Sequence, residues 1–264
     1  MLRTNFLKAT LDGGDPVIGT WAIIPSVVTA DVIAATGVDF VVIDTEHGPI
    51  GFETAQAMAI ACEARNVSPV IRVGGVIEAE ILRALDVGAH AIHVPNVLTA
   101  ADARRIVALA KYPPAGNRGF SPFTRAGGYS AVNAQRLTGE ANANTMVCIH
   151  IEGVDSVERI GTFLEIDGID IVFVGLYDLS KGMGLPGQVD HPEVLAKLDE
   201  CIDAVLAAGK IPGTIANTPE QMHSMLDRGI RYLTYSVDCE MLGRPYREAA
   251  ETFREATGKV RGPE

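Results

Sequence analysis

Eight short apolar runs, rich in β-branched residues, alternate with helical patterns along the 264 residues of this chain. Typical runs are Val-Val-Ile at 41–43 and Ile-Val-Phe-Val at 171–174. Runs without polar alternation are typical of strands buried on both faces, as in parallel sheets. The predicted strands are Val17–Ile24, Phe40–Asp44, Pro69–Val73, Ala91–Pro95, Met146–Ile151, Ile171–Gly175, Ile211–Ala216 and Tyr232–Val237.

Helical periodicity fills the intervals between these strands. The predicted helices are Thr29–Thr36, Phe52–Arg65, Ile77–Leu85, Ala100–Lys111, Pro192–Ala208, Pro219–Arg228, a final one at about Glu240–Thr257, and a short one before the first strand. Thr218 before Pro219 marks a helix start, because a side-chain cap followed by proline suits the first turn. Glycines at 88, 209 and 229 mark helix ends.

Strict strand–helix alternation with eight strands favours an α/β fold, a single (β/α)₈ TIM barrel with an extra helix at each end, over an open sheet. Such a barrel takes roughly 250 residues, so we predict one domain over residues 1–264. The first strand is not followed by G-x-G-x-x-G, which disfavours a dinucleotide-binding fold. The long interruption Tyr112–Asn144 is predicted to be functional or to contain a helix of its own.

Composition limits the partners and the compartment. The formal net charge of −11 argues against nucleic acid or an anionic membrane as the main partner. The chain has no apolar run of the roughly 18–20 residues needed to span a membrane, and its start does not resemble a signal peptide. The four cysteines lie far apart without a C-x-x-C pair, which predicts a reducing, cytoplasmic location.

Polar residues follow four of the predicted strands where each strand ends. His47 comes after the second strand, Arg72 ends the third, and Glu152 and Asp178 follow the fifth and sixth. Barrel enzymes build their sites at this end of the strands. Two carboxylates from adjacent strands suit a hard divalent cation such as Mg²⁺ or Mn²⁺. A general acid/base pair of carboxylates, as in glycosidases, fits the same spacing.

The basic residues of this rim also have two interpretations. Arg72 offers a fixed fork of donors to an oxyanion or carboxylate, and His47 suits a general base if a carboxylate orients it. Each of these charges, taken alone, also fits a solvated loop residue or a structural ion pair. His90 and His93, which flank the fourth strand, are interpreted as buried structural groups.

The same residues form a series of motifs in order along the chain. They are Asp44-x-Glu46-His47-Gly48-Pro49, Arg72, Leu85-Asp86-Val87-Gly88-Ala89, Val94-Pro95, Tyr112-Pro113-Pro114-x-Gly116-x-Arg118-Gly119, Glu152 and Gly175-x-x-Asp178-Leu179-Ser180. The series resembles the metal-dependent (class II) pyruvate aldolases of the 4-hydroxy-2-oxo-heptanedioate aldolase type, in the aldolase/citrate lyase superfamily. The resemblance covers nearly the whole chain, and its Tyr-Pro-Pro-x-Gly-x-Arg-Gly string is highly specific.

The resemblance implies a role for each matching residue. His47 is the acid/base group, and Asp86 is the carboxylate that raises its basicity. Arg72 stabilises the transition state. Glu152 and Asp178 hold a divalent cation: Mg, Mn or Co.

The same resemblance assigns substrate contacts, and here the chain departs from its relatives. His150 stands where a substrate-binding glutamine is usual, and Tyr177 stands where a small residue is usual. Gly175 and Asp178 complete the implied substrate-binding set. The departures leave the identity of the substrate open.

The implied activity is the reversible retro-aldol cleavage of a 4-hydroxy-2-oxo acid to the pyruvate enolate and an aldehyde, in the breakdown of aromatic compounds or sugar acids. The alternatives are another enolate-forming lyase, like citrate lyase or malyl-CoA lyase, and a barrel that has lost its activity. The predicted strand ends carry no lysine for a Schiff base. The resemblance also implies a homo-oligomer, a hexamer or trimer, with the final helix on a neighbour; closure of its own barrel is the alternative.

Overall fold

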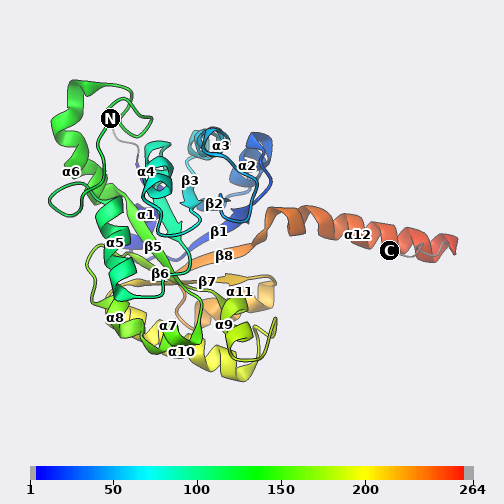
Figure 1. Ribbon diagram of the computed structural model, residues 1–264. Coiled ribbons are helices and arrows are strands. Elements are labelled where there is room, and N and C mark those ends of the chain that lie inside the picture. The colour runs from blue at the N-terminus through cyan, green and yellow to red at the C-terminus, as the bar shows by residue number, and fades with distance from the viewer. Residues whose placement is uncertain (1–3, 259–264) are drawn as a thin grey trace.

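The computed structural model describes residues 4–258, in which eight parallel strands close into a barrel (Figure 1). The strands pair in chain order, and the last pairs with the first. They are β1 (Val17–Ala22), β2 (Phe40–Asp44), β3 (Ser68–Arg72), β4 (Ala91–Val94), β5 (Met146–Ile151), β6 (Ile171–Val174), β7 (Ile211–Ala216) and β8 (Tyr232–Val237). The predicted (β/α)₈ barrel is confirmed. The single-domain prediction covers 1–264, of which 1–3 and 259–264 lie outside the described residues.

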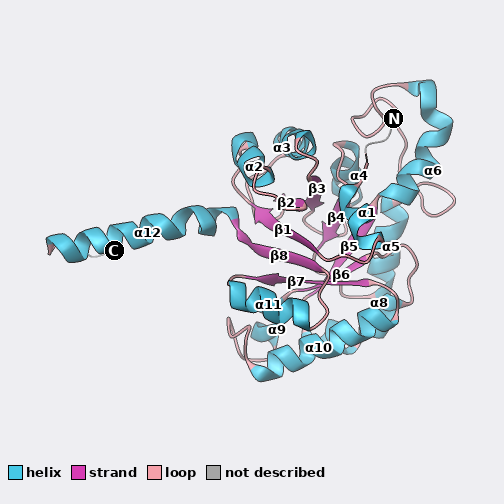
Figure 2. Cartoon of the chain, turned by 180° about the vertical axis from the view of Figure 1, so that it is seen from behind, coloured by secondary structure: helices cyan, strands magenta, loops and turns pink. Residues whose placement is uncertain are grey.

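Helices surround the barrel, as Figure 2 shows from behind. They are α1 (Phe6–Asp12), α2 (Val27–Ala34), α3 (Phe52–Ala64), α4 (Glu78–Asp86), α5 (Ala100–Ala110), the 3₁₀ turn η1 (Ala131–Asn133), α6 (Ala134–Asn144), α7 (Val154–Glu158), α8 (Ile160–Leu164), α9 (Leu176–Gly182), α10 (Pro192–Ala207), α11 (Pro219–Asp227) and α12 (Asp238–Thr257). The predicted cap of α11 is present, since the Thr218 side chain accepts a hydrogen bond from the backbone N–H of Gln221. Gly88, Gly209 and Gly229 have positive φ, as expected after a helix end.

Two hydrophobic layers hold the barrel together. One lies between strands and helices, and the other fills the barrel interior with side chains that include Trp21, Phe40, Phe173 and Tyr232. Phe40 and Tyr232 stack with ring centroids 4.2 Å apart. Only glycine fits at position 19, because a Cβ added at Gly19 would lie 2.4 Å from the ring of Phe40. The interior is therefore packed, and the open space available to a ligand lies at the ends of the strands.

The structure differs from the sequence prediction in short elements. Helices α7, α8 and α9 were not predicted, because five to seven residues are too few to show a helical period. The interruption 112–144 contains α6, one of the two predicted alternatives. Strand β1 ends at Ala22, not at Ile24, because the Asp238 carboxylate accepts the backbone N–H groups of Ile23 and Ile24 at 3.1 and 3.0 Å.

The final helix does not cover its own barrel. Figures 1 and 2 show α12 leaving the end of β8 and projecting away from the other elements. Asp238 is its one buried residue among those described. The predicted alternative, in which this helix closes the barrel, is therefore wrong. Among residues 4–258, no helix has the length and apolar character needed to cross a membrane.

Candidate active site

A cleft of about 280 Å³ opens at the carboxyl ends of the strands. All the predicted site residues except Asp86 line it: His47, Arg72, His150, Glu152, Gly175, Tyr177 and Asp178. They come from the segments that end or follow β2, β3, β5 and β6, so parallel closure of the barrel brings distant parts of the sequence to one rim.

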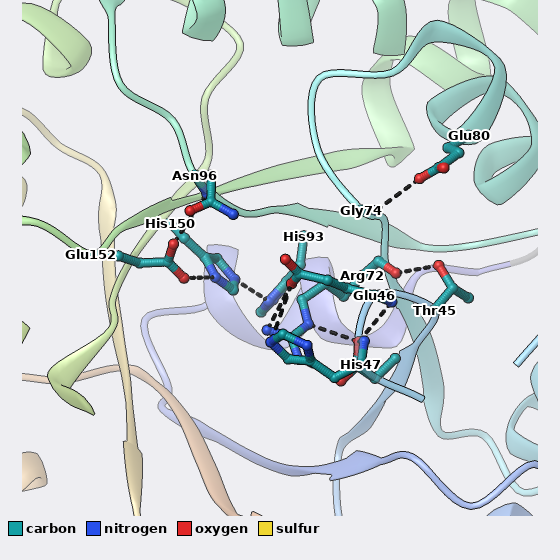
Figure 3. Close-up of polar contacts among 11 residues, drawn as sticks. Thr45, Glu46, His47, Arg72, Gly74, Glu80, His93, Asn96, His150 and Glu152 are labelled. Atoms are coloured by element: carbon teal, nitrogen blue, oxygen red, sulfur yellow. Dashed lines mark hydrogen bonds and ion pairs between the residues drawn. The ribbon is translucent and has the colours of Figure 1, made fainter. Parts of the chain in front are cut away.

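Arg72 is held rigidly at one side of the cleft (Figure 3). Its Nε donates to Asp44 Oδ1 at 2.8 Å, and its Nη2 donates to Asp44 Oδ2. Its Nη1 lies 3.1 Å from Glu46 Oε2, and Cζ lies 4.4 Å from the centre of the Trp21 ring. A bidentate ion pair with a second carboxylate and a stacked ring fixes the plane of the guanidinium. The donors that remain are preorganised toward the cleft.

Asp44 and Glu46 link this arginine to His47. Asp44 is buried, and its Oδ1 also accepts the backbone N–H groups of Glu46 and His47 at 3.0 and 3.2 Å. The turn after β2 is thereby fixed. The His47 ring is 70% exposed, and its Nε2 lies 3.9 Å from Glu46 Oε2. Glu46 is thus the carboxylate that this chain places beside His47.

Asp86 does not lie in the cleft. It ends α4, at the end of the barrel opposite to His47, because α4 runs back from the carboxyl end of β3 to the start of β4. Its Oδ1 accepts a hydrogen bond from Nη2 of the buried Arg118 at 2.7 Å. The predicted contact between Asp86 and His47 is therefore not made within the chain.

Glu152 is anchored on the other side of the cleft. Its Oε1 accepts a hydrogen bond from His150 Nδ1 at 3.0 Å, and its Oε2 accepts the backbone N–H of Asn96 at 3.1 Å (Figure 3). Burial raises the pKa of Glu152, but the His150 and Asn96 hydrogen bonds and the charge of Arg72 outweigh it, and the pKa lies below its ordinary value. Glu152 is therefore ionised at neutral pH.

Gly175 leaves room for this carboxylate. A Cβ added at Gly175 would lie 2.9 Å from Glu152 Cγ, closer than carbon atoms approach in proteins. Gly175 also caps α9, so Tyr177 and Asp178 occupy the first turn of that helix. The Tyr177 hydroxyl accepts a hydrogen bond from Asn217 Nδ2 at 2.9 Å, which ties the ring to the segment after β7 along the rim of the cleft.

The His150 ring does not present a free nitrogen to substrate. Its side chain is buried, and both ring nitrogens are engaged, Nδ1 with Glu152 and Nε2 with His93 Nδ1 at 2.9 Å. The donor and acceptor that the usual glutamine offers to substrate are therefore not available here unless one of these bonds breaks. Its direct effect is on Glu152.

The site has the oxygen ligands that suit a divalent cation. Glu152 and Asp178 line the same cleft, and Asp178 is 58% exposed, with Lys181 Nζ at 3.4 Å as its ion-pair partner. Two carboxylates with space beside them fit Mg²⁺ or Mn²⁺. Gly175 keeps the space beside Glu152 clear. The residues present therefore fit the predicted metal.

A second group of metal-ligand types lies deeper. Ligand atoms of His93, Cys148 and His150 lie within 4.8 Å of one another. The four imidazole nitrogens already have partners, since His93 Nε2 bonds the Tyr232 hydroxyl at 2.8 Å. Burial also raises the pKa of the Cys148 thiol well above its ordinary value, which disfavours the thiolate. This group is held by hydrogen bonds rather than by a metal.

Comparison with known proteins supports the resemblance drawn from the motifs. Residues 18–245 match the family model described as HpcH/HpaI aldolase/citrate lyase. The chain belongs to the HpcH/HpaI aldolase/citrate lyase family. It is 34% identical over 250 residues to 4-hydroxy-2-oxo-heptane-1,7-dioate aldolase of Salmonella paratyphi C, and the match covers 94% of both chains.

Solved structures of this family share the whole fold. An HpcH/HpaI aldolase from Desulfitobacterium hafniense is 29% identical, with a TM-score of 0.90 over 98% of this chain and 99% of that one. Citrate synthase SbnG is 31% identical, with a TM-score of 0.86 over 97% of this chain and 100% of that one. The activities for which these relatives are named all make or break a carbon–carbon bond.

Several residues that shape the site have no role that the sequence alone predicts. Asp44 and Glu46 were quoted in a motif, and their place at a strand end was a usable signal. Trp21, the one tryptophan, stacks on Arg72 and donates from Nε1 to Thr234 Oγ1 at 3.0 Å. The backbone N–H of Asn96 gave no signal, because any residue type except proline supplies it.

Proposed function

We propose that this protein is a divalent-metal-dependent carbon–carbon lyase that cleaves a 4-hydroxy-2-oxo acid to pyruvate and an aldehyde, reversibly. The observation that supports it most is the arrangement of one cleft, with a fixed guanidinium at Arg72, an anchored carboxylate at Glu152 and an exposed imidazole at His47. The name of the Salmonella relative supports the same reaction class.

The reaction breaks the bond between C3 and C4 of the 2-oxo acid and leaves negative charge on the pyruvate enolate. Glu152 and Asp178 would hold a divalent cation, which would supply Lewis-acid stabilisation of that charge. Arg72 binds the developing oxyanion with the N–H donors that Asp44 and Glu46 leave free. Because these carboxylates fix the guanidinium before substrate arrives, little reorganisation is needed in the transition state.

His47 takes the proton from the C4 hydroxyl as the bond breaks. Its exposed ring reaches substrate from the turn that Asp44 fixes, and Glu46 at 3.9 Å stabilises the imidazolium that forms. The apolar Trp21 and Phe173 line the floor of the cleft and exclude water from the enolate.

A Schiff base is not part of this proposal. Among the lining residues of the described cleft there is no lysine. Lys181 is exposed beside Asp178, and Lys210 Nζ bonds the carbonyls of Ile166 and Ile169 at the start of β7.

Pyruvate release from a panel of 4-hydroxy-2-oxo acids, with Mn²⁺ or with excess chelator, tests the proposal. We expect release with metal and none with chelator, with Glu152→Gln inactive in both. Release in excess chelator would contradict the metal-dependent class. Turnover of citrate or an acyl-CoA ester instead of the panel would favour the alternative, a lyase like citrate lyase or malyl-CoA lyase. The likeness to citrate synthase SbnG is the reason to include these substrates.

We also propose that copies of this chain form a homo-oligomer, a trimer or hexamer, through α12. The helix leaves Leu242, Tyr246 and Phe253 exposed by 58, 72 and 59%. Beside its root lies an apolar groove of about 500 Å³, lined by residues that include Val28 and Val32 of α2. A groove and a projecting apolar helix on one chain suit exchange of helices between copies.

The cytoplasmic location stays a prediction. All four cysteines are free, which agrees with the reducing compartment that the sequence predicts.

A further inference from the structure

A chain of hydrogen bonds runs from the barrel interior to Glu152 (Figure 3 shows its last two links). The Tyr232 hydroxyl lies 2.8 Å from His93 Nε2, His93 Nδ1 lies 2.9 Å from His150 Nε2, and His150 Nδ1 lies 3.0 Å from Glu152 Oε1. Tyr232 and His93 are completely buried and do not line the cleft. The reaction proposed above uses neither of them.

The direction of each hydrogen bond follows from the groups at its two ends. The ionised Glu152 only accepts, so His150 Nδ1 carries the proton and donates. With its proton on Nδ1, His150 accepts at Nε2 from His93 Nδ1, and His93 Nε2 accepts from the Tyr232 hydroxyl. All donors point toward Glu152.

The surroundings keep Tyr232 and His93, the two completely buried members of this series of hydrogen bonds, uncharged. Burial, with the nearby charge of Arg72, holds the pKa of His93 well below its ordinary value. Burial also raises the pKa of Tyr232 well above its ordinary value, so the hydroxyl keeps the proton that it donates. The uncharged Tyr232 hydroxyl, 139 positions away in the sequence, thus supplies a proton donor to His93 Nε2.

Aromatic packing holds the rings in this arrangement. The Trp21 ring meets His93 and His150 edge to face, with centroids 5.4 and 6.0 Å apart. Phe173 stacks on His150 at 4.9 Å. A rotation of either imidazole would break this packing as well as two hydrogen bonds.

We propose that Tyr232 and His93 are positioning residues for metal binding, which act through the His150 tautomer to aim the Glu152 carboxylate at the cation. The proposal rests on the proposed metal-dependent function. With one hydrogen bond on each oxygen, from His150 and from Asn96, the carboxylate is held in one orientation and keeps lone pairs for a metal. Such outer contacts typically change metal affinity by about 10- to 100-fold.

Loss of the tyrosine hydroxyl releases the far end of the chain. In Tyr232→Phe the ring still stacks on Phe40, but His93 Nε2 has lost its donor. The opposite tautomers of His93 and His150 then compete, and they turn the His150 Nδ1 lone pair toward Glu152. We expect the affinity for Mn²⁺ to fall about tenfold.

Titration calorimetry with Mn²⁺ alone tests this, on wild type, Tyr232→Phe, His150→Gln and the double variant. Tyr112→Phe is the matched control, because it removes a hydroxyl from another buried ring, beside Arg118 at the opposite end of the barrel. We expect the control to stay within about twofold of wild type. The double variant should bind no more weakly than His150→Gln, because Tyr232 acts through His150.

Side-chain ¹⁵N spectra of the metal-free protein give a second readout, and its wild-type part does not depend on any variant folding. We expect His93 and His150 as neutral Nδ1–H tautomers in wild type, and mixed tautomers in Tyr232→Phe. A wild-type His150 with its proton on Nε2, equal Mn²⁺ affinity of wild type and Tyr232→Phe, or additive effects in the double variant would each overturn the inference. Wild-type protein that binds Mn²⁺ but cleaves none of the panel would overturn the proposed function alone.

Discussion

Arg72 shows at the scale of one residue how position, and not charge alone, is built into this site. A lysine at this place keeps the charge, but a single ammonium cannot bridge both oxygens of Asp44 and still reach Glu46. We therefore expect Arg72→Lys to lower kcat/KM. The loss of transition-state stabilisation should be on the order of 3 kcal/mol, the size of one lost oxyanion donor. Steady-state kinetics measure it.

Arg65→Lys is the matched control for this variant. Arg65 pairs with Asp31 in the same two-bond geometry, Nε to Oδ1 at 2.6 Å and Nη2 to Oδ2 at 3.0 Å, but on the surface. We expect it to leave kinetics unchanged. Activity of Arg72→Lys within a few-fold of wild type would reduce Arg72 to charge balance.

His47 is expected to act at the C4 hydroxyl and not at the methyl group of pyruvate. His47→Asn should therefore slow aldol cleavage at least about a hundredfold while it leaves exchange of the pyruvate methyl protons much less affected. Proton exchange into deuterated water, followed by NMR, measures the second reaction. An equal loss in both reactions would place His47 at enolate formation instead.

Gly175 is expected to matter through Glu152. The methyl group of Gly175→Ala would meet Glu152 Cγ at 2.9 Å, so the carboxylate must shift and the Mn²⁺ affinity should fall about tenfold or more. Calorimetry with Mn²⁺ measures the change. Gly161→Ala is the control, because a Cβ there meets nothing within 4 Å. Unchanged affinity in Gly175→Ala would show that Glu152 does not hold the metal.

At the scale of elements, the strands were predictable because each is a continuous apolar run with its polar residues just beyond its end. Parallel closure makes neighbours of those ends, which is why the sequence alone sufficed to group His47, Arg72 and Glu152. Helix α9 was not predictable, because seven residues show no period, although it carries Asp178. The helix begins after Gly175, and this residue is a glycine because a side chain there would collide with Glu152.

Contacts inside the barrel were beyond the reach of motifs. The bond between His93 and Tyr232 joins β4 to β8, and nothing in either segment reveals the other. The sequence predicted correctly that His93 is a buried, hydrogen-bonded group, but not that it is connected to Glu152. For Asp86, a motif match predicted a place beside His47, and within one chain the residue lies beside Arg118.

At the scale of the whole molecule, a single barrel leaves the apolar face of α12 uncovered. The helix carries an apolar stripe at positions 242, 246, 249, 250 and 253, spaced to lie on one face. In a single copy this stripe faces solvent. Exposure of several large apolar groups on a projecting helix is costly, and a second copy with the groove beside α2 removes the cost.

The last prediction tests that assembly. We expect light scattering to give a multiple of 28.0 kDa, as a trimer or hexamer, for wild type. Burial of each aromatic ring contributes about 1.5–3 kcal/mol, so Tyr246→Ser with Phe253→Ser should weaken association at least a hundredfold per exchanged helix. The paired control is Glu251→Ser with Glu255→Ser, which places the same two serines on the opposite face. A monomeric wild type, or equal dissociation of both double variants, would rule out α12 as the contact, since only loss of the apolar stripe should separate the copies while each barrel stays folded.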